Sequence, residues 1–253
     1  GSVQSGCRGR ASDATRLRLR SYNAAGRAGW SVHGAALCLG AAPRQESTQL
    51  QLTNPETIRS ITGEWKGERD KNGRPLVTDD VLRRMEKVTT EEAWGVLRRN
   101  GYTENFAGGW KTLDPEHILV GRAVTCRYVP GRPDVESAVN SVGEAEGRIG
   151  GQNSWAIDEL VEDDVIVVDM FGKIRDGVFA GDNLATAIKV NTNRGMVLDG
   201  GLRDTQGIMQ FPEFGVFVRD FHPSAFTSVT MVEINGITRI GEATCLPGDV
   251  VLG

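Results

Sequence analysis

The sequence predicts an α/β protein: a layered sandwich with a mixed sheet, preceded by an N-terminal helical arm. From residue 119 onward, short apolar runs alternate with helical segments, which is typical of strand–helix–strand units. Residues 165–170 form a continuous apolar run, as expected of a strand that is buried on both faces. The last third, residues 227–251, is rich in strand-forming residues and turns, and this favours a mixed sheet over a purely parallel one.

The arm is expected to occupy residues 46–115 and to be mainly helical. Pro55 follows an asparagine and suits the first position of a helix over about residues 55–64. Threonines that can cap a helix precede two further helical segments, at about residues 79–87 and 90–99. The second of these ends at an Asn-Gly pair, which is a common helix stop.

The core is expected to occupy residues 116–253. A glycine-rich loop in it, residues 147–151, fits neither the P-loop nor the dinucleotide fingerprint, so we expect a flexible turn there. The last third is divided by turns at residues 235–236 and 247–248. The other expected elements are a strand at 119–129, a helix at 134–146, a strand at 165–170, a helix at 181–193, a strand at 195–198, a short helix after Arg203, and a strand at 215–219.

An uneven charge distribution sets the first 45 residues apart from the rest. They contain seven arginines and one acid, Asp13, a net charge of +6; because the whole chain carries −4, residues 46–253 carry −10. The leader is also rich in alanine, glycine and serine, a composition that fits a disordered segment, an organelle transit peptide or, less well, a basic RNA-binding tail. The acidic body is not expected to bind nucleic acid.

Hydropathy and cysteine content narrow the class of protein further. No apolar run approaches the roughly 18 residues that cross a bilayer, so no membrane partner is expected. The four cysteines, Cys7, Cys38, Cys126 and Cys245, show no C-x-x-C spacing, so neither a zinc site nor a disulfide framework is expected. A reducing compartment, and so a cytoplasmic location unless the leader targets an organelle, is the simplest expectation.

The first candidate site segment is G-D-N-L-A-T-A-I, which begins at Gly181. It is predicted to start a helix, and a helix start presents unpaired backbone N–H groups and a partial positive charge to an anion. Gly181 permits a close approach of a ligand to the backbone. Asp182 lies in the first helical turn, a common place for an acid whether or not it has a function.

The second candidate segment is L-D-G-G-L-R-D, residues 198–204, read as a strand that ends in a glycine turn. Arg203 can clamp an anion with two hydrogen bonds, and Asp204 offers a hard oxygen ligand to a divalent cation. A salt-bridged arginine beside a helix-capping aspartate would also explain this pair. Both segments, however, follow apolar strands at the end where ligands collect in α/β sheets. Together they predict a metal-assisted site for a small oxo-acid.

The order G-D-N-L-A-T-A followed by G-L-R-D resembles the RraA-like family, as do the later segments V-F-V-R-D-F-H-P and L-P-G-D-V-V. The family includes divalent-metal pyruvate aldolases that act on 4-hydroxy-4-methyl-2-oxoglutarate and 4-carboxy-4-hydroxy-2-oxoadipate. It also includes regulators of ribonuclease E, which lack the aspartate of the R-D pair. Asp204 is present here, so the resemblance favours the metal-dependent branch and implies a swivelling-domain type of fold.

The resemblance also implies roles for individual residues. Asp204 would be the protein ligand of Mg2+ or Mn2+, and Arg203 would hold the oxo-acid and stabilise its enolate oxygen. The backbone N–H groups of Asn183 and Leu184, next to Gly181, would take the substrate carboxylate. The catalytic residues would be Arg203 and Asp182, the latter orienting the waters of the metal shell.

The implied activity is a lyase that cleaves a 4-hydroxy-2-oxo acid by a retro-aldol reaction and releases pyruvate, with oxaloacetate decarboxylation as a side activity. Lys173, in an expected loop, and Lys189 are read as surface residues rather than Schiff-base lysines. His222, before Pro223, could shuttle a proton, but a lone histidine in a polar loop is more often a surface residue or a local hydrogen-bond partner, and this is the interpretation that we favour. The alternative is a non-catalytic binding protein, either of the ribonuclease-regulator type or an oligomeric scaffold.

Assembly is also part of what the resemblance implies. Relatives form trimers or hexamers and continue beyond the position of Gly253 through another strand and a helix. In the aldolases that C-terminal part supplies an acidic residue to the neighbouring subunit's site. A homotrimer or homohexamer is therefore expected, with a core that ends earlier than in relatives.

Overall fold

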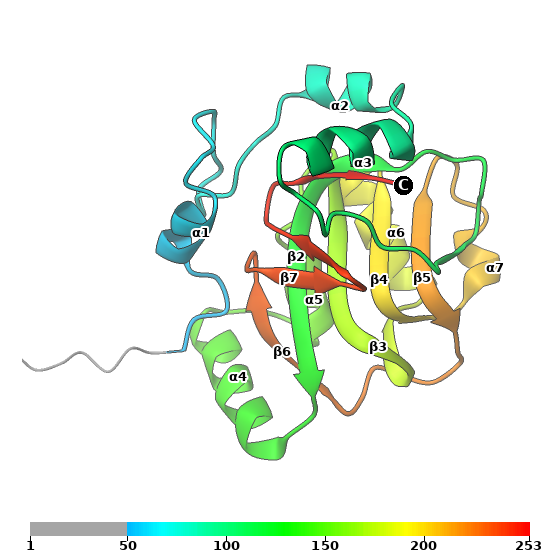
Figure 1. Ribbon diagram of the computed structural model, residues 1–253. Coiled ribbons are helices and arrows are strands. Elements are labelled where there is room, and N and C mark those ends of the chain that lie inside the picture. The colour runs from blue at the N-terminus through cyan, green and yellow to red at the C-terminus, as the bar shows by residue number, and fades with distance from the viewer. Residues whose placement is uncertain (1–49) are drawn as a thin grey trace, which may run out of the picture. The chain divides into compact units, whose positions relative to one another are not determined.

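The computed structural model describes residues 50–253, which form a mixed sheet flanked by helices (Figure 1). The basic leader predicted for residues 1–45 lies outside the described residues. Within residues 50–253, no helix has the length and apolar character needed to cross a membrane. The helices are α1 (Pro55–Ile61), α2 (Asp79–Met85), α3 (Thr90–Arg99), α4 (Pro133–Ala145), α5 (Gln152–Ile157), α6 (Asp182–Thr192) and α7 (Thr205–Ile208).

The main sheet has seven strands in the order β1-β5-β4-β3-β2-β6, with β9 also paired to β2. Strands β2 to β5 run parallel to one another, whereas β1, β6 and β9 pair antiparallel, so the predicted mixed sheet is confirmed. Strands β7 and β8 form a separate hairpin. The bounds are β1 (Lys111–Thr112), β2 (Val120–Pro130), β3 (Asp164–Ala180), β4 (Gly195–Leu202), β5 (Gly215–Phe221), β6 (Val229–Ile234), β7 (Thr238–Ile240), β8 (Ala243–Cys245) and β9 (Val250–Leu252).

The two faces of the sheet bury different partners. Because side chains alternate along a strand, Ile166 and Val168 of β3 join a core that also contains residues of α4, α5, α6 and α7, whereas Val165 and Val167 face the other way. That second face packs against Ile240 of the β7–β8 hairpin and Trp110 of the arm. Helices α4 to α7 therefore cover one face of the sheet. Residues of the arm and the β7–β8 hairpin pack on the other face.

The arm contains the three predicted helices, and side chains cap the starts of α1 and α3, whereas Thr78, the N-cap residue of α2, makes no side-chain capping hydrogen bond. The Asn54 side chain accepts hydrogen bonds from two backbone N–H groups of α1, and Thr89 forms a capping box with Glu92 at the start of α3. The arm also contributes strand β1. This strand was not predicted from the sequence, because two residues are too few to show a pattern. Figure 1 shows α2 and α3 at the end of the sheet where β2 begins and where the chain ends.

Two predicted strands are wrong in extent, and one helix of the structure was not predicted. Strand β3 runs through residues 171–180 instead of stopping at 170, so Lys173 lies in a strand, in register with Gly200, and not in a loop. Strand β4 continues through Gly200 and Gly201, which are therefore not a turn; an added Cβ at Gly200 would lie 3.0 Å from Met170 Cβ. Helix α5 was not predicted, because its six residues are too short for a helical period to appear.

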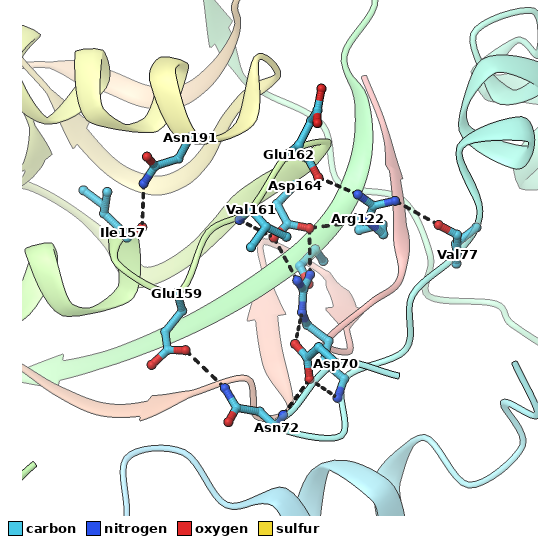
Figure 2. Close-up of polar contacts among 12 residues, drawn as sticks. Asp70, Asn72, Val77, Arg122, Ile157, Glu159, Val161, Glu162, Asp164 and Asn191 are labelled. Atoms are coloured by element: carbon cyan, nitrogen blue, oxygen red, sulfur yellow. Dashed lines mark hydrogen bonds and ion pairs between the residues drawn. The ribbon is translucent and has the colours of Figure 1, made fainter. Parts of the chain in front are cut away.

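A buried group of charges joins the arm to the amino ends of the parallel strands, and we call Arg74, Arg122 and Asp164 the anchor cluster (Figure 2). Arg74 donates from both terminal nitrogens to the two oxygens of Asp164, each at 2.8 Å. Arg122 lies 3.5 Å from Asp164 and also donates to the Val77 carbonyl at 2.9 Å. Asp164 also accepts a hydrogen bond from the Val161 N–H, so its carboxylate is fully paired.

The charge of Arg74 is maintained in spite of its burial. Burial alone would lower the pKa of Arg74, but the hydrogen bonds and negative charges of Asp164 and Asp70 raise it above its ordinary value. Asp70 also accepts from the backbone N–H groups of Asn72 and Arg74, which shapes the turn that carries the guanidinium inward. The anchor cluster is therefore a complete structural unit with no unpaired charge to offer a ligand.

Candidate functional site

The two predicted site segments meet at the carboxyl ends of β3 and β4. The Arg203 N–H donates to the Ala180 carbonyl at 3.2 Å, which places the residue after β4 directly beside the end of β3. A Cβ added to Gly181 would overlap Asp204 Oδ2 and would come within 3.0 Å of Arg203 Nε. The φ of Gly181 is −116°, which any residue can adopt, so the backbone does not require glycine here; a larger residue would instead displace the exposed Asp204 and Arg203 side chains.

The start of α6 forms one wall of the site. Gly181 is the N-cap, and Asp182 opens the helix with its Oδ1 accepting the Asn183 N–H at 2.8 Å. The next amide, that of Leu184, is one of the N–H groups that a helix start leaves without an intrahelical acceptor. Helix α7 packs against this end, since a Cβ added to Gly207 would lie 3.1 Å from Asp182 Cβ. The helix start is thus held firmly beside Arg203 and Asp204.

Arg203 and Asp204 form a partly exposed ion pair. Arg203 Nε lies 3.3 Å from Asp204 Oδ2, and the two side chains retain 42% and 47% of their exposure. Asp204 has a left-handed backbone, with φ 55° and ψ 37°, which directs the chain sharply from β4 into α7. The two side chains are close enough to contact the same ligand. They are also exposed enough for a ligand to replace their contact with each other.

The donor set fits a hydrated magnesium or manganese ion better than a cation enclosed by protein ligands. Among residues 50–253, no group of three or more histidine, cysteine or acidic side chains is placed to hold a metal ion. Mg2+ is usually held by one or two carboxylates and keeps several waters. Asp204, with Asp182 at the neighbouring helix start, supplies carboxylates of that kind at an exposed position.

The end of β5 adds a third segment that the sequence reading did not include in the site. His222 donates its backbone N–H to the Leu202 carbonyl at 3.0 Å, so the turn after β5 lies beside Arg203. Arg203 Nη1 donates to the Ser224 carbonyl at 3.4 Å. The available signal was the H-P dipeptide after an apolar strand, which marks a strand end but not its neighbour in the sheet.

A second set of charges lies on the arm-facing side of the sheet, near its centre. Asp169 of β3 and Asp199 of β4 are in register, and Arg239 of β7 contacts both, at 3.1 and 3.4 Å. Arg219 donates to Asp199 at 2.5 Å, and its guanidinium carbon lies 3.7 Å from the centre of the Trp110 ring. The hydrogen bond and charge of Asp169 raise the pKa of Arg239. These acids are thus paired with arginines rather than free.

Two cavities lie apart from the predicted site residues. One, of about 380 Å3, lies beside the hairpin and is lined by Arg127, Asp169 and Arg239 among others. The other, of about 300 Å3, lies at the loop of residues 146–149 and borders Asp158 and Glu159. Neither cavity is lined by Gly181, Asp182, Asn183, Leu184, Arg203 or Asp204.

Comparison with known families identifies the fold family. A family model described as RraA-like, Aldolase/RraA, matches residues 77–253. The chain belongs to the RraA-like family. The match includes both segments of the site and all the strands from β1 to β9. Membership in a family that spans aldolases and RraA proteins is thereby established, and the description covers both kinds of member.

Solved structures agree with an RraA-like fold. RraAS2 of Streptomyces coelicolor, described as an unusual member of the RNase ES inhibitor RraA family, is 23% identical with a TM-score of 0.58, over 70% of this chain and 82% of that one. An uncharacterized protein from Pseudomonas syringae pv. tomato is 21% identical with a TM-score of 0.53, over 70% and 76% of the two chains. A structure described among novel cellulases from gut-associated microbes is 22% identical with a TM-score of 0.58, over 78% and 82%. At these identities the likeness concerns the fold alone.

Proposed function

We propose that this protein is a divalent-metal-dependent lyase that cleaves a 4-hydroxy-2-oxo acid by a retro-aldol reaction and releases pyruvate. The observation that carries the proposal is the meeting of Arg203, Asp204 and the start of α6 around Gly181. It combines a cation, a carboxylate able to hold a metal ion and a helix start suited to a carboxylate within one small surface. Membership in the RraA-like family, whose description names aldolases, supports it.

The chemistry follows from where charge develops. The C4 hydroxyl loses its proton, the C3–C4 bond breaks, and its electron pair moves to C3 and the C2 carbonyl, leaving the enolate of pyruvate; protonation at C3 then gives pyruvate. A Mg2+ or Mn2+ ion held by Asp204 would supply an electrophile for the developing oxyanion. The Arg203 guanidinium, on the same side, adds hydrogen bonds that are strongest when that oxygen is negative.

Carboxylate binding is assigned to the start of α6. Asp182 Oδ1 accepts the Asn183 N–H in this structure, so of the two assigned amides the Leu184 N–H is the one open to a substrate carboxylate. Rotation of the Asp182 side chain would release the Asn183 N–H as a second donor. Oxaloacetate would bind in the same way and lose CO2 from C4, because breaking its C3–C4 bond leaves the same enolate.

Pyruvate release is the direct test. The full chain is assayed with oxaloacetate and with 4-hydroxy-4-methyl-2-oxoglutarate by coupling to lactate dehydrogenase, first with Mg2+ or Mn2+ and then with excess chelator. We expect metal-dependent release that the chelator abolishes and added metal restores. Substitution Asp204→Ala removes the proposed ligand and should lower the rate at least about 100-fold, because the metal contributes several kcal/mol to oxyanion stabilisation.

Asp134→Ala is the matched control, since Asp134 is an acid in the first turn of another helix, α4, and forms an exposed ion pair with Arg132. We expect it to retain the parent rate. A folded parent protein that releases no pyruvate with any of these metals would overturn the proposal, and an Asp204→Ala variant as active as the parent would overturn the ligand assignment. If the folded parent protein releases no pyruvate, the alternative is a non-catalytic binding role for the surface around Gly181.

A further inference from the structure

The turn after β5, His222–Ser224, holds the predicted catalytic arginine through a chain of hydrogen bonds. The Ser224 N–H donates to His222 Nδ1 at 3.1 Å, and the Ser224 carbonyl accepts from Arg203 Nη1 at 3.4 Å. The Ser224 hydroxyl oxygen accepts the Asp176 N–H at 2.7 Å, which ties the same residue to β3. Ser224 is therefore fixed on three sides, by its own turn, by β3 and by Arg203.

The imidazole determines one of those three sides. A ring nitrogen accepts a hydrogen bond only when it carries no proton, so this contact requires the His222 tautomer with Nδ1 unprotonated and the proton on Nε2. In that form the side chain closes a turn from residue 222 to the amide of residue 224, as asparagine does in an Asx-turn. Without an acceptor at this position the Ser224 amide is released, and the direction of the Ser224 carbonyl is no longer fixed from that side.

The consequence reaches Arg203 because its other partner is Asp204. Arg203 Nε pairs with Asp204 at 3.3 Å, whereas Nη1 is directed to Ser224. With the Ser224 carbonyl in place, the guanidinium is held between two points. Without it, the guanidinium has only the carboxylate that is proposed to hold the metal, and it would settle on that carboxylate instead of facing the substrate.

We propose that His222 is a positioning residue that sets the orientation of the Arg203 guanidinium through the backbone of Ser224. The proposal rests on the proposed lyase function for its effect on turnover, but the contact itself is independent of that function. It assigns a role to the third strand end of the site. It gives the Arg203 guanidinium, whose side chain is 42% exposed, a second point of attachment besides Asp204.

Paired substitutions separate positioning from simple packing. His222→Leu removes the acceptor at similar bulk, whereas His222→Asn places Oδ1 where Nδ1 lies and can still accept the Ser224 N–H. We expect kcat/KM for pyruvate release to fall about fivefold or more in His222→Leu, and to stay within about twofold of the parent in His222→Asn, since one neutral hydrogen bond is at stake. His117→Leu, at a half-buried histidine before β2, is the control and should match the parent.

Nuclear magnetic resonance on the unliganded protein tests the contact without any activity. We expect the His222 nitrogen shifts to show a proton on Nε2, and the Ser224 amide and Arg203 Nε–H signals to move in His222→Leu but not in His222→Asn. A proton on Nδ1, or an active His222→Leu variant equal to the parent in kcat/KM, would overturn the inference. If the parent releases no pyruvate, the lyase proposal fails, and the resonance signals alone decide on His222.

Discussion

Two arginine–aspartate pairs lie at opposite ends of the parallel part of the sheet, and they differ in burial and in hydrogen bonding. At the amino ends, Arg74 and Asp164 are nearly inaccessible, with side-chain exposures of 1% and 0%. At the carboxyl ends, Arg203 and Asp204 keep 42% and 47% of theirs. The first pair makes two hydrogen bonds of 2.8 Å, whereas the second makes one contact of 3.3 Å.

The difference shows how one pair of residue types serves two purposes. Removing one partner of a buried pair leaves a charge without solvent, which is strongly destabilising, so the Arg74–Asp164 pair stays closed. An exposed pair contributes little to stability because water competes with it. Breaking the contact between Arg203 and Asp204 to bind a ligand would therefore cost little free energy. The comparison can be tested by asking which pair matters for folding and which for chemistry.

The largest expected effect is on the buried side. Asp164→Asn leaves Arg74 and Arg122 facing a neutral amide in a buried site, and we expect a loss of about 3–5 kcal/mol in the free energy of unfolding. The matched change Asp204→Asn should cost less than about 1 kcal/mol, because its pair is exposed. Denaturant unfolding of both variants measures this directly. Equal losses would show that burial does not distinguish the two ends.

A methyl group at Gly181 should affect chemistry more than folding. Gly181→Ala would displace the exposed Asp204 and Arg203 side chains from the helix start, and because these side chains can move into solvent we expect a loss of roughly 1 kcal/mol or less in the free energy of unfolding. Pyruvate release should fall more steeply than stability, since the displaced groups are those proposed to act on the substrate. Gly95→Ala is the control: it lies inside α3, where the nearest atom to the new Cβ is 3.4 Å away, and alanine favours a helix. Thermal melts and the coupled assay on both variants give the comparison.

Arg203→Lys tests whether the exposed arginine acts as a fork or only as a charge. Lysine keeps the charge but cannot donate two parallel hydrogen bonds. The loss of one hydrogen bond to a charged group costs about 1.5–3 kcal/mol, so we expect kcat/KM to fall roughly 10- to 100-fold. The unfolding midpoint should hardly change. Full activity in this variant would mean that charge alone is sufficient at the carboxyl ends.

The smallest effect is expected at the margin of the anchor cluster. The Asn72 side chain donates to Glu159 at 3.1 Å, and this hydrogen bond joins the arm to the segment after α5 (Figure 2). Asn72→Ala should lower the free energy of unfolding by about 0.5–1.5 kcal/mol, because it removes one hydrogen bond to a carboxylate at a part-buried position where water can partly replace it. Pyruvate release should be unaffected. A loss of unfolding free energy as large as that of Asp164→Asn would mean that Asn72 and Glu159 belong to the anchor cluster.

Long, capped or strongly apolar segments were predictable, and short or bent ones were not. The cap at Asn54 and the apolar run of β3 carry their signals locally, and both were found from the sequence. The extension of β3 through Lys173 depends on pairing with β4, and the six-residue helix α5 and the two-residue strand β1 are too short to show a pattern. A Gly-Gly pair that reads locally as a turn lies inside β4, because β3 packs closely against it.

By itself, the sequence determined the fold class, the family and the two segments of the candidate site, because strand periodicity, capping and the order of glycines and charges are local properties. Only the tertiary structure decided which charges are neighbours. It pairs Arg74 with Asp164, which is 90 residues away in the sequence. It also places Ser224, in the turn after β5, in contact with Arg203, which follows the adjacent strand β4. Strand order and register bring these groups together, and they arise from packing the whole sheet rather than from any single segment.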